Sequence, residues 1–216
     1  MKIKSWSLSA LNLYTQCPLK YKYVRIDKRG EPTSYALQNG ISVHSKAEYY
    51  LKGEIESIPK ELIKFSNEFK NLKRMNALPE EAVVLDNKWQ IIQDDNAWFC
   101  NDAWLRMKID ARIDNYIVDF KTGRHYEEHE DQANLYATAL LLNAPEIDSV
   151  DVEFWYLNSG EVWSYEFNQL QALESKVKWE EKVQIMNNDE DFAPKKNLWC
   201  KYCHFKPGCP IYGGSL

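Results

Sequence analysis

The spacing of the cysteines restricts this chain more than any other feature of its sequence. Cys200, Cys203 and Cys209 follow the pattern C-x2-C-x5-C, and a C-x2-C pair places two thiolates on one tight turn, as in zinc and iron–sulfur sites. A tetrahedral ion or a cubane cluster needs a fourth ligand. Cys17, in the segment Q-C-P-L-K-Y, is the natural candidate, and His204 is the alternative for zinc. A site that includes Cys17 brings the two ends of the chain together.

The number of cysteines and the start of the chain indicate in which cellular compartment the protein is expected. An odd count of five cysteines disfavours a disulfide framework. The first residues lack the apolar stretch of a signal peptide, and no run of about 18 apolar residues predicts a membrane span. We therefore expect a cytoplasmic protein with no membrane partner. Cys100 lies in strand-like sequence and is expected to be a buried structural thiol.

The net charge of −5 disfavours a nucleic-acid partner until its distribution is considered. Residues 1–29 carry seven basic side chains, Lys2 and Lys4 among them, and one acidic side chain. Residues 195–216 carry four basic side chains and no acidic one, so the segment 30–194 carries a net −15. This distribution is compatible with phosphate binding by the ends and metal binding in the middle. Solvated surface charge is the alternative.

Hydrophobic periodicity predicts an α/β fold in which helices flank a central mixed β-sheet. Asp114-Asn115 supplies a turn between two strands, and Asn168 with Gln171 forms a predicted capping box for the last helix. We expect one domain over 1–216, with 1–30 and 195–216 forming a cysteine region around a core at 35–192. The predicted helices are 9–16, 35–52, 59–73, 128–143 and a long one after Asn168; the predicted strands are 83–92, 98–114, 116–121, 150–157 and 161–167.

Two acidic residues and a lysine on the middle strands form a candidate catalytic group. A hairpin turn lets Asp110 and Asp119 converge from adjacent strands, and side-chain alternation sends Asp119 and Lys121 to one face while Phe120 packs on the other. Two carboxylates can hold Mg²⁺ or Mn²⁺, and a lysine can orient or help deprotonate a water that attacks a phosphodiester. Taken alone, this pattern more often decorates a strand surface.

Residues on two predicted helices extend this group. Gln132 and Tyr136 share one helix face and could grip a phosphate or a base, or could form an ordinary polar stripe. His44 stands alone in an apolar helix, where a histidine is more often a packing residue than a metal ligand. Glu48, four residues on, could bind the same metal or could stabilise the helix.

Six short motifs in order resemble a known family: C-P-x-x-Y, G-x-x-x-H, I-D, D-x-K-T-G, Q-x-x-x-Y and C-x2-C-x5-C. The chain resembles the RecB-like branch of the PD-(D/E)XK nuclease superfamily over about residues 5–210. More narrowly, it is similar to iron–sulfur members such as the CRISPR-associated RecB-like exonuclease and AddB-type nuclease domains. The resemblance implies a restriction-endonuclease-like core. No Walker motif occurs, so the chain has no helicase motor of its own.

The resemblance also implies roles for individual residues. His44, Asp110, Asp119 and the Phe120 carbonyl would bind the catalytic Mg²⁺ or Mn²⁺, Lys121 would be the catalytic lysine, Gln132 and Tyr136 would contact DNA, and Cys17, Cys200, Cys203 and Cys209 would hold a 4Fe–4S cluster. The chain departs from the family at Lys108, where relatives often have Gly, and at Asp119, where many have Glu.

These observations predict a metal-dependent DNA exonuclease that acts on single-stranded DNA or DNA ends and carries a structural 4Fe–4S cluster. Two alternatives stay open: a non-catalytic DNA-end-binding module, and the same nuclease with structural zinc in place of the cluster. The length suggests a small phage or CRISPR-associated enzyme in the cytoplasm. The sequence identifies DNA as a partner and indicates no particular protein partner.

Overall fold

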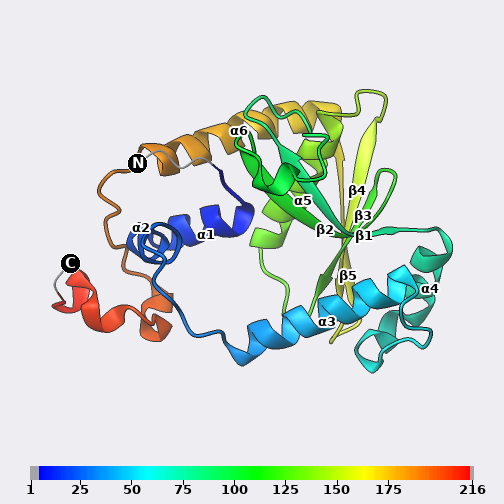
Figure 1. Ribbon diagram of the computed structural model, residues 1–216, viewed down its shortest axis with the longest axis horizontal. Helices are drawn as coiled ribbons and strands as arrows, with labels where there is room; N and C mark the ends of the chain where they lie inside the picture. The colour runs from blue at the N-terminus through cyan, green and yellow to red at the C-terminus, as the bar shows by residue number, and fades with distance from the viewer. Residues whose placement is uncertain (1–4, 215–216) are drawn as a thin grey trace. The chain divides into compact units, whose positions relative to one another are not determined.

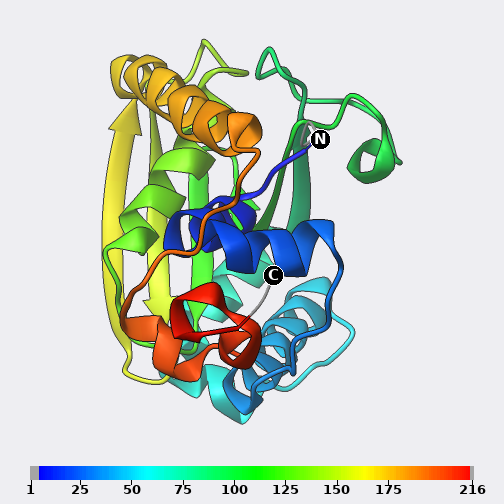
Figure 2. The same ribbon diagram turned by 90° about the vertical axis from the view of Figure 1, so that its left-hand side faces the viewer.

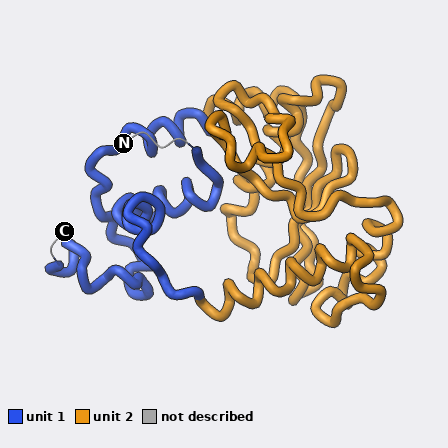
Figure 3. Tube along the Cα trace, in the orientation of Figure 1, with its two compact units in different colours: residues 1–33, 179–216 blue, residues 34–178 orange. Residues whose placement is uncertain are grey.

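The computed structural model describes residues 5–214, so the predicted basic residues Lys2 and Lys4 lie outside the described residues. The chain forms two compact units (Figure 3). Unit 1 contains residues 1–33 and 179–216, and unit 2 contains residues 34–178. The sequence analysis assigned residues 179–192 to the catalytic core, whereas the structure groups them with the chain ends.

Unit 2 is built on a five-stranded sheet with strand order β1-β2-β3-β4-β5. β3 and β4 are parallel, and the other neighbouring strands are antiparallel, so the predicted mixed sheet with flanking helices is confirmed. The strands are β1 (Leu78–Leu85), β2 (Leu105–Ile113), β3 (Tyr116–Lys121), β4 (Ser149–Tyr156) and β5 (Glu161–Asn168).

Helices cover both faces of this sheet (Figures 1 and 2). α3 (Tyr35–Lys52) and α4 (Ser66–Arg74) pack on one face, where Phe120 and Trp155 join their apolar side chains. α5 (Glu128–Leu141) lies across the other face against β4 and β5. Because side chains alternate along β3, Phe120 enters the core while Asp119 faces α5.

Two predicted strands and one predicted helix differ from the structure by more than one or two terminal residues. β1 ends at Leu85, and the predicted strand 83–92 is wrong beyond it, because Asp86 Oδ1 accepts hydrogen bonds from the backbone N–H groups of Lys88 and Gln90 at 2.8 and 2.9 Å. This turn reverses the chain. The predicted helix 59–73 begins as the 3₁₀ helix η2 (Lys60–Phe65) and becomes α-helical only in α4, because Phe65 has non-helical dihedrals.

The predicted strand 98–114 is shorter than expected and begins only at Leu105. The 3₁₀ helix η3 (Ala97–Phe99) precedes it, and Cys100 lies in the turn that follows η3 rather than in a strand. Asn101 and Asp102 continue this turn, consistent with their preference for turn conformations. Cys100 is half-buried beside a small apolar cluster that includes Val84.

Unit 1 contains both chain ends. Its N-terminal part consists of α1 (Leu8–Gln16), α2 (Pro18–Tyr21) and the π-helix η1 (Lys22–Ile26). Its C-terminal part ends in three 3₁₀ helices, η4 (Leu198–Tyr202), η5 (Lys206–Gly208) and η6 (Pro210–Tyr212). In Figure 2 the orange and red C-terminal segment runs beside the blue N-terminal helices.

Hydrogen bonds join the two parts of unit 1. Tyr14 donates to Asp189 Oδ2 at 2.8 Å, and Lys195 Nζ donates to the Thr15 carbonyl at 3.0 Å. Asn197 donates to the Gln16 carbonyl, the residue before Cys17, at 2.8 Å. The C-terminal tail is therefore anchored directly beside Cys17.

α6 (Gln169–Asn188) begins with the predicted capping box. Asn168 Oδ1 accepts from the Gln171 N–H at 3.0 Å, and Gln171 Oε1 accepts from the Asn168 N–H at 2.9 Å. This reciprocal pair is confirmed. Within residues 5–214, no helix combines the length and the apolar composition needed to cross a bilayer.

Candidate active site

The β2–β3 hairpin determines where the two predicted carboxylates lie. The antiparallel ladder pairs Ile113 with Tyr116 and continues to Ala111 with Val118, where it ends. One step further in the same register, Asp110 stands opposite Asp119. The turn residues Asp114-Asn115 set this register, so the predicted convergence follows from a two-residue loop.

A distortion in β1 places a third carboxylate in the same row. Pro79 pairs with Ala111 and Glu81 pairs with Ile109, which leaves Glu80 opposite Asp110 without a ladder pair. Glu80 has a φ of 53°, in the left-handed region that residues with a Cβ rarely adopt. Such a conformation costs of order 1–3 kcal/mol and is typical of functional sites.

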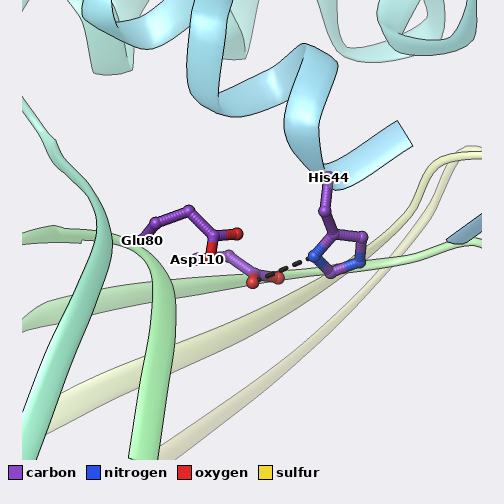
Figure 4. Close-up of side chains that lie close together, drawn as sticks. All are labelled: His44, Glu80 and Asp110. Carbon is purple, nitrogen blue, oxygen red and sulfur yellow. Dashed lines mark hydrogen bonds and ion pairs between the residues drawn. The ribbon is translucent and has the colours of Figure 1, made fainter. Parts of the chain in front are cut away.

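His44 reaches this row from α3 (Figure 4). Its Nδ1 lies 3.0 Å from Asp110 Oδ1, and Asp110 Oδ2 accepts a hydrogen bond from the Phe120 N–H at 2.7 Å. One ligand atom each from His44, Glu80 and Asp110 lies within 4.8 Å of the others, and this is the one such three-residue group in residues 5–214. Glu80 also forms an ion pair with Lys108.

The environment moves the pKa values of His44 and Asp110 upward. Burial raises the pKa of Asp110 to about 6, helped by the charge of Asp119 and opposed by His44 and the Phe120 N–H. Burial alone would lower the pKa of His44, but its hydrogen bond to Asp110 and the surrounding carboxylates raise it to about 9. At neutral pH the two residues therefore form an ion pair, with the proton on His44. A metal ion that binds this imidazole would displace the proton.

Asp119 is held by groups from β3 and α5. Its Oδ2 accepts from Gln132 Nε2 at 2.9 Å and lies 3.0 Å from the Tyr136 hydroxyl. Its Oδ1 is buried, lies 2.5 Å from Lys121 Nζ, and accepts no hydrogen bond from the described residues. Gln132 Oε1 in turn accepts from Lys121 Nζ at 2.7 Å. Gln132 thus contacts both Asp119 and Lys121, whereas Tyr136 contacts Asp119.

One pocket of about 320 Å³ is lined by all seven residues that the sequence analysis placed around the catalytic metal and the DNA. Six further residues complete its lining, and none of them was predicted to act there. The predicted residues are His44, Asp110, Asp119, Phe120, Lys121, Gln132 and Tyr136, and the additional ones are Lys108, Thr122, Gly123, Arg124, Tyr126 and His129.

The donor set fits a divalent cation. Carboxylate oxygens suit Mg²⁺ and Mn²⁺, an imidazole nitrogen suits Mn²⁺, and the buried Oδ1 of Asp119 is an acceptor that lacks a hydrogen bond. Asp119 lies outside the 4.8 Å group, in which Glu80 joins His44 and Asp110. Glu48 is not part of this group and forms an ion pair with Lys52 at 2.6 Å.

The sequence analysis missed Glu80. Its signal was the acidic pair Glu80-Glu81 directly before the apolar run Ala-Val-Val-Leu, but the predicted strand began only at residue 83. Pro79 is also a residue that central strands disfavour. β1 is an edge strand, however, and an edge position tolerates proline.

In unit 1, the four predicted cluster ligands line a single cavity of about 120 Å³. Cys17 comes from the N-terminal part, and Cys200, Cys203 and Cys209 come from the tail. His204, the alternative zinc ligand, is exposed and does not line this cavity. Within residues 5–214, no three of the four sulfur atoms lie within 4.8 Å of one another. Zinc–sulfur bonds of about 2.3 Å would require sulfur separations of about 3.8 Å.

The solved structure titled "Crystal structure of SSO0001" matches with a TM-score of 0.48 and 17% sequence identity, covering 98% of this chain and 88% of that chain. No curated protein sequence matches this chain.

A sequence profile described as the PD-(D/E)XK nuclease superfamily matches residues 5–210. The matched region includes the hairpin carboxylates, the lysine of β3 and the helix that carries Gln132 and Tyr136. The family implies a nuclease fold that uses divalent metals. With most of its length covered, this chain belongs to the PD-(D/E)XK nuclease superfamily.

Proposed function

We propose that this protein is a metal-dependent DNA exonuclease of the RecB-like, iron–sulfur type, which degrades single-stranded DNA or DNA ends. The observation that carries the proposal is the single pocket lined by Asp110, Asp119, Lys121 and His44 in a chain of this superfamily. An acidic metal-binding pocket with one lysine is suited to phosphodiester hydrolysis.

His44, Asp110 and Asp119, with the Phe120 carbonyl and the additional carboxylate of Glu80, would hold Mg²⁺ or Mn²⁺. The bound ion would supply Lewis-acid activation of water and would stabilise charge on the phosphate. Lys121 would orient the attacking water, and its contacts with Asp119 and Gln132 fix the direction of its ammonium group. Gln132 and Tyr136 would hold Asp119 and Lys121 in place while also lining the path of the DNA.

Unit 1 would bind the DNA strand. Trp199 and Tyr202 are 58% and 72% exposed and stand three residues apart on η4, so a 3₁₀ helix places them on one side. Lys201 Nζ lies 4.8 Å from the centre of the Tyr202 ring. Exposed aromatic rings beside basic groups are typical of surfaces that stack unpaired bases and contact the phosphate backbone.

The four cysteines would hold a structural 4Fe–4S cluster that fastens the chain ends together. The sulfur spacing supports a cluster over a single zinc ion. The four cysteines line one cavity, and within residues 5–214 no three of their sulfur atoms lie within 4.8 Å of one another, whereas a zinc tetrahedron needs separations of about 3.8 Å.

Substitution of Asp119 or Lys121 by alanine tests the catalytic assignment. We expect Asp119→Ala and Lys121→Ala each to lower cleavage by at least about a hundredfold, because each removes a group that acts on the charge developing at the phosphate. The measurement is degradation of end-labelled single- and double-stranded DNA with and without Mn²⁺.

Two matched substitutions serve as controls for that experiment. Asp102→Ala and Lys70→Ala remove the same charges at exposed positions and should cleave normally. Full cleavage by both pocket variants would contradict the proposal. Retention of DNA by the unsubstituted protein without any degradation would instead indicate a DNA-end-binding module.

A further inference from the structure

His129, in the first turn of α5, lines the active-site pocket beside Lys121. It has no role in the sequence prediction or in the proposed function. Its ring stacks on Phe154, with 5.5 Å between ring centres and 27° between planes. The ring is therefore held in a defined orientation between α5 and the sheet.

Hydrogen bonds assign the tautomer of this histidine. His129 Nδ1 lies 2.5 Å from the Tyr156 hydroxyl and 3.4 Å from the backbone N–H of Tyr126. A backbone N–H can only donate, so Nδ1 is an acceptor and the ring proton resides on Nε2. Burial and the positive charge of Lys121 lower the pKa of His129 to about 4, which keeps the ring neutral near pH 7.

The Nε2–H group is left as a free donor on a ring that lines the pocket. Within residues 5–214 no protein group accepts a hydrogen bond from it. It is also not one of the buried polar atoms that lack a partner in this part of the chain, so it is accessible to solvent. Phe154 and Tyr156 fix the ring, so its Nε2–H has a defined orientation and can donate a hydrogen bond to a ligand.

Arg124 supplies a second free donor to the same pocket. It is exposed, and no ion pair or hydrogen bond joins its guanidinium to any described residue. Lys121, in contrast, is already engaged by Asp119 and Gln132. His129 and Arg124 therefore offer a neutral imidazole N–H and a guanidinium that no described residue engages, beside the hydroxyls of Thr122 and Tyr126 in the same lining.

We propose that His129 and Arg124 form a phosphate-binding subsite for the substrate strand, in which the Nε2–H of His129 donates to a non-bridging phosphate oxygen and Arg124 supplies the positive charge. The inference rests on the proposed function. Without a bound cation, the carboxylates of Glu80, Asp110 and Asp119 repel a phosphodiester, and donors elsewhere in the pocket offset this repulsion. Two groups that only donate match phosphate oxygens, which every nucleotide carries, and the subsite therefore tolerates any base sequence.

Paired substitutions test the donor. His129→Phe keeps the stacked ring and removes the N–H, whereas His129→Gln restores an amide N–H at a similar reach. We expect His129→Phe to weaken binding of a fluorescein-labelled oligothymidylate about tenfold, as for loss of one charge-assisted hydrogen bond, and His129→Gln to recover most of the loss. Arg124→Ala should also weaken binding and reduce the slope of log affinity against log salt by about one.

Nitrogen NMR of the unsubstituted protein provides a readout that depends on neither cleavage nor a variant. The ¹⁵N shifts of His129 should report a neutral ring protonated at Nε2, and addition of thymidine 3′,5′-bisphosphate should move the Nε2 signal. A proton on Nδ1, or a His129→Phe variant that binds the oligonucleotide as tightly as the unsubstituted protein, would overturn the subsite.

The outcomes separate this inference from the proposed function. If the unsubstituted protein binds the oligonucleotide through His129 but does not degrade it with Mn²⁺, the nuclease proposal fails and the subsite stands. If the protein degrades DNA and His129→Phe binds and degrades it equally well, only the subsite fails. Absence of both binding and cleavage would overturn both.

Discussion

Asp110 connects every group of the candidate metal site. It lies next to His44, accepts the Phe120 N–H, and stands in one row with Glu80 and Asp119. Because it is buried among other carboxylates, its pKa is raised to about 6, and it stabilises a proton on His44 up to about pH 9. The site in its metal-free form is thus an imidazolium–carboxylate pair over a wide pH range.

Metal affinity should depend on pH through this pair. A metal ligand nitrogen must be deprotonated, and His44 keeps its proton until about pH 9. Affinity for Mn²⁺ should therefore rise with pH by about tenfold per unit between roughly pH 6.5 and 8.5. Titration calorimetry across this range measures the slope. His44→Gln should bind Mn²⁺ more weakly, and its affinity should depend much less on pH. An unchanged slope in that variant would exclude His44 as the source of the pH dependence.

His129 should make the folded protein less stable at low pH. Its pKa falls to about 4 in the folded protein from an ordinary value near 6.5. The unfolded chain therefore takes up the proton first, and the stability associated with the neutral ring is lost as pH falls from about 6.5 through 4.

The contribution of His129 to the pH dependence of stability can be measured by comparing the unsubstituted protein with His129→Phe. Between pH 7 and pH 4.5, the metal-free protein should lose on the order of 2 kcal/mol more unfolding free energy than His129→Phe, after allowance for solvent screening. Urea unfolding at the two pH values gives the comparison. Equal losses in both proteins would mean that the ring is not held neutral by the fold.

At the scale of elements, the hairpin and helices that carry the predicted pocket residues were predictable, and the distorted edge strand was not. The limits of β3 match those predicted, because alternating side chains and the turn at Asp114-Asn115 are local signals. His44 and Gln132 lie on helices whose periodicity was clear. Glu80 depends on a left-handed backbone conformation in β1 and on pairing with a strand nearly thirty residues away. Neither condition is local in the sequence.

Glu80 gives a test at this scale. Glu80→Gln should weaken Mn²⁺ affinity by at least about tenfold, because an amide is a poorer ligand than a carboxylate for a hard cation. Glu81→Gln is the matched control, since Glu81 pairs with Arg112 rather than with His44 and Asp110. Calorimetric titration measures the Mn²⁺ affinity of both variants. If the two variants bind Mn²⁺ equally tightly, Glu80 is not a metal ligand.

At the scale of the whole molecule, the two units differ in how the chain builds them. Unit 2 is one continuous segment, whereas unit 1 combines the two ends, with Tyr14 and Asp189 separated by 175 positions. The pocket residues all lie in unit 2, and the four cysteines that line the other cavity all lie in unit 1. The proposed metal site and the proposed cluster site therefore lie in separate units.

Substitution of cysteines should separate the two units experimentally. Cys200→Ser/Cys203→Ser should abolish iron content and visible absorption in anaerobically purified protein and should lower the melting temperature of unit 1, because two of four ligands are lost. Cys100→Ser, in unit 2, is the matched control and should retain the iron. Calorimetry and metal analysis check both results, and a colourless unsubstituted protein with stoichiometric zinc would overturn the cluster.

The discontinuity of unit 1 also has a consequence for biosynthesis. Cys17 leaves the ribosome 183 residues before Cys200, so it waits as a free thiol through most of translation. Unit 2 does not depend on the C-terminal tail in this way, because residues 34–178 are all synthesised before the tail. A chain that stops short of Cys200 therefore still contains every residue that lines the candidate active-site pocket, but it lacks three of the four cysteines. Occupancy of that site would mark the chains whose translation reached the tail.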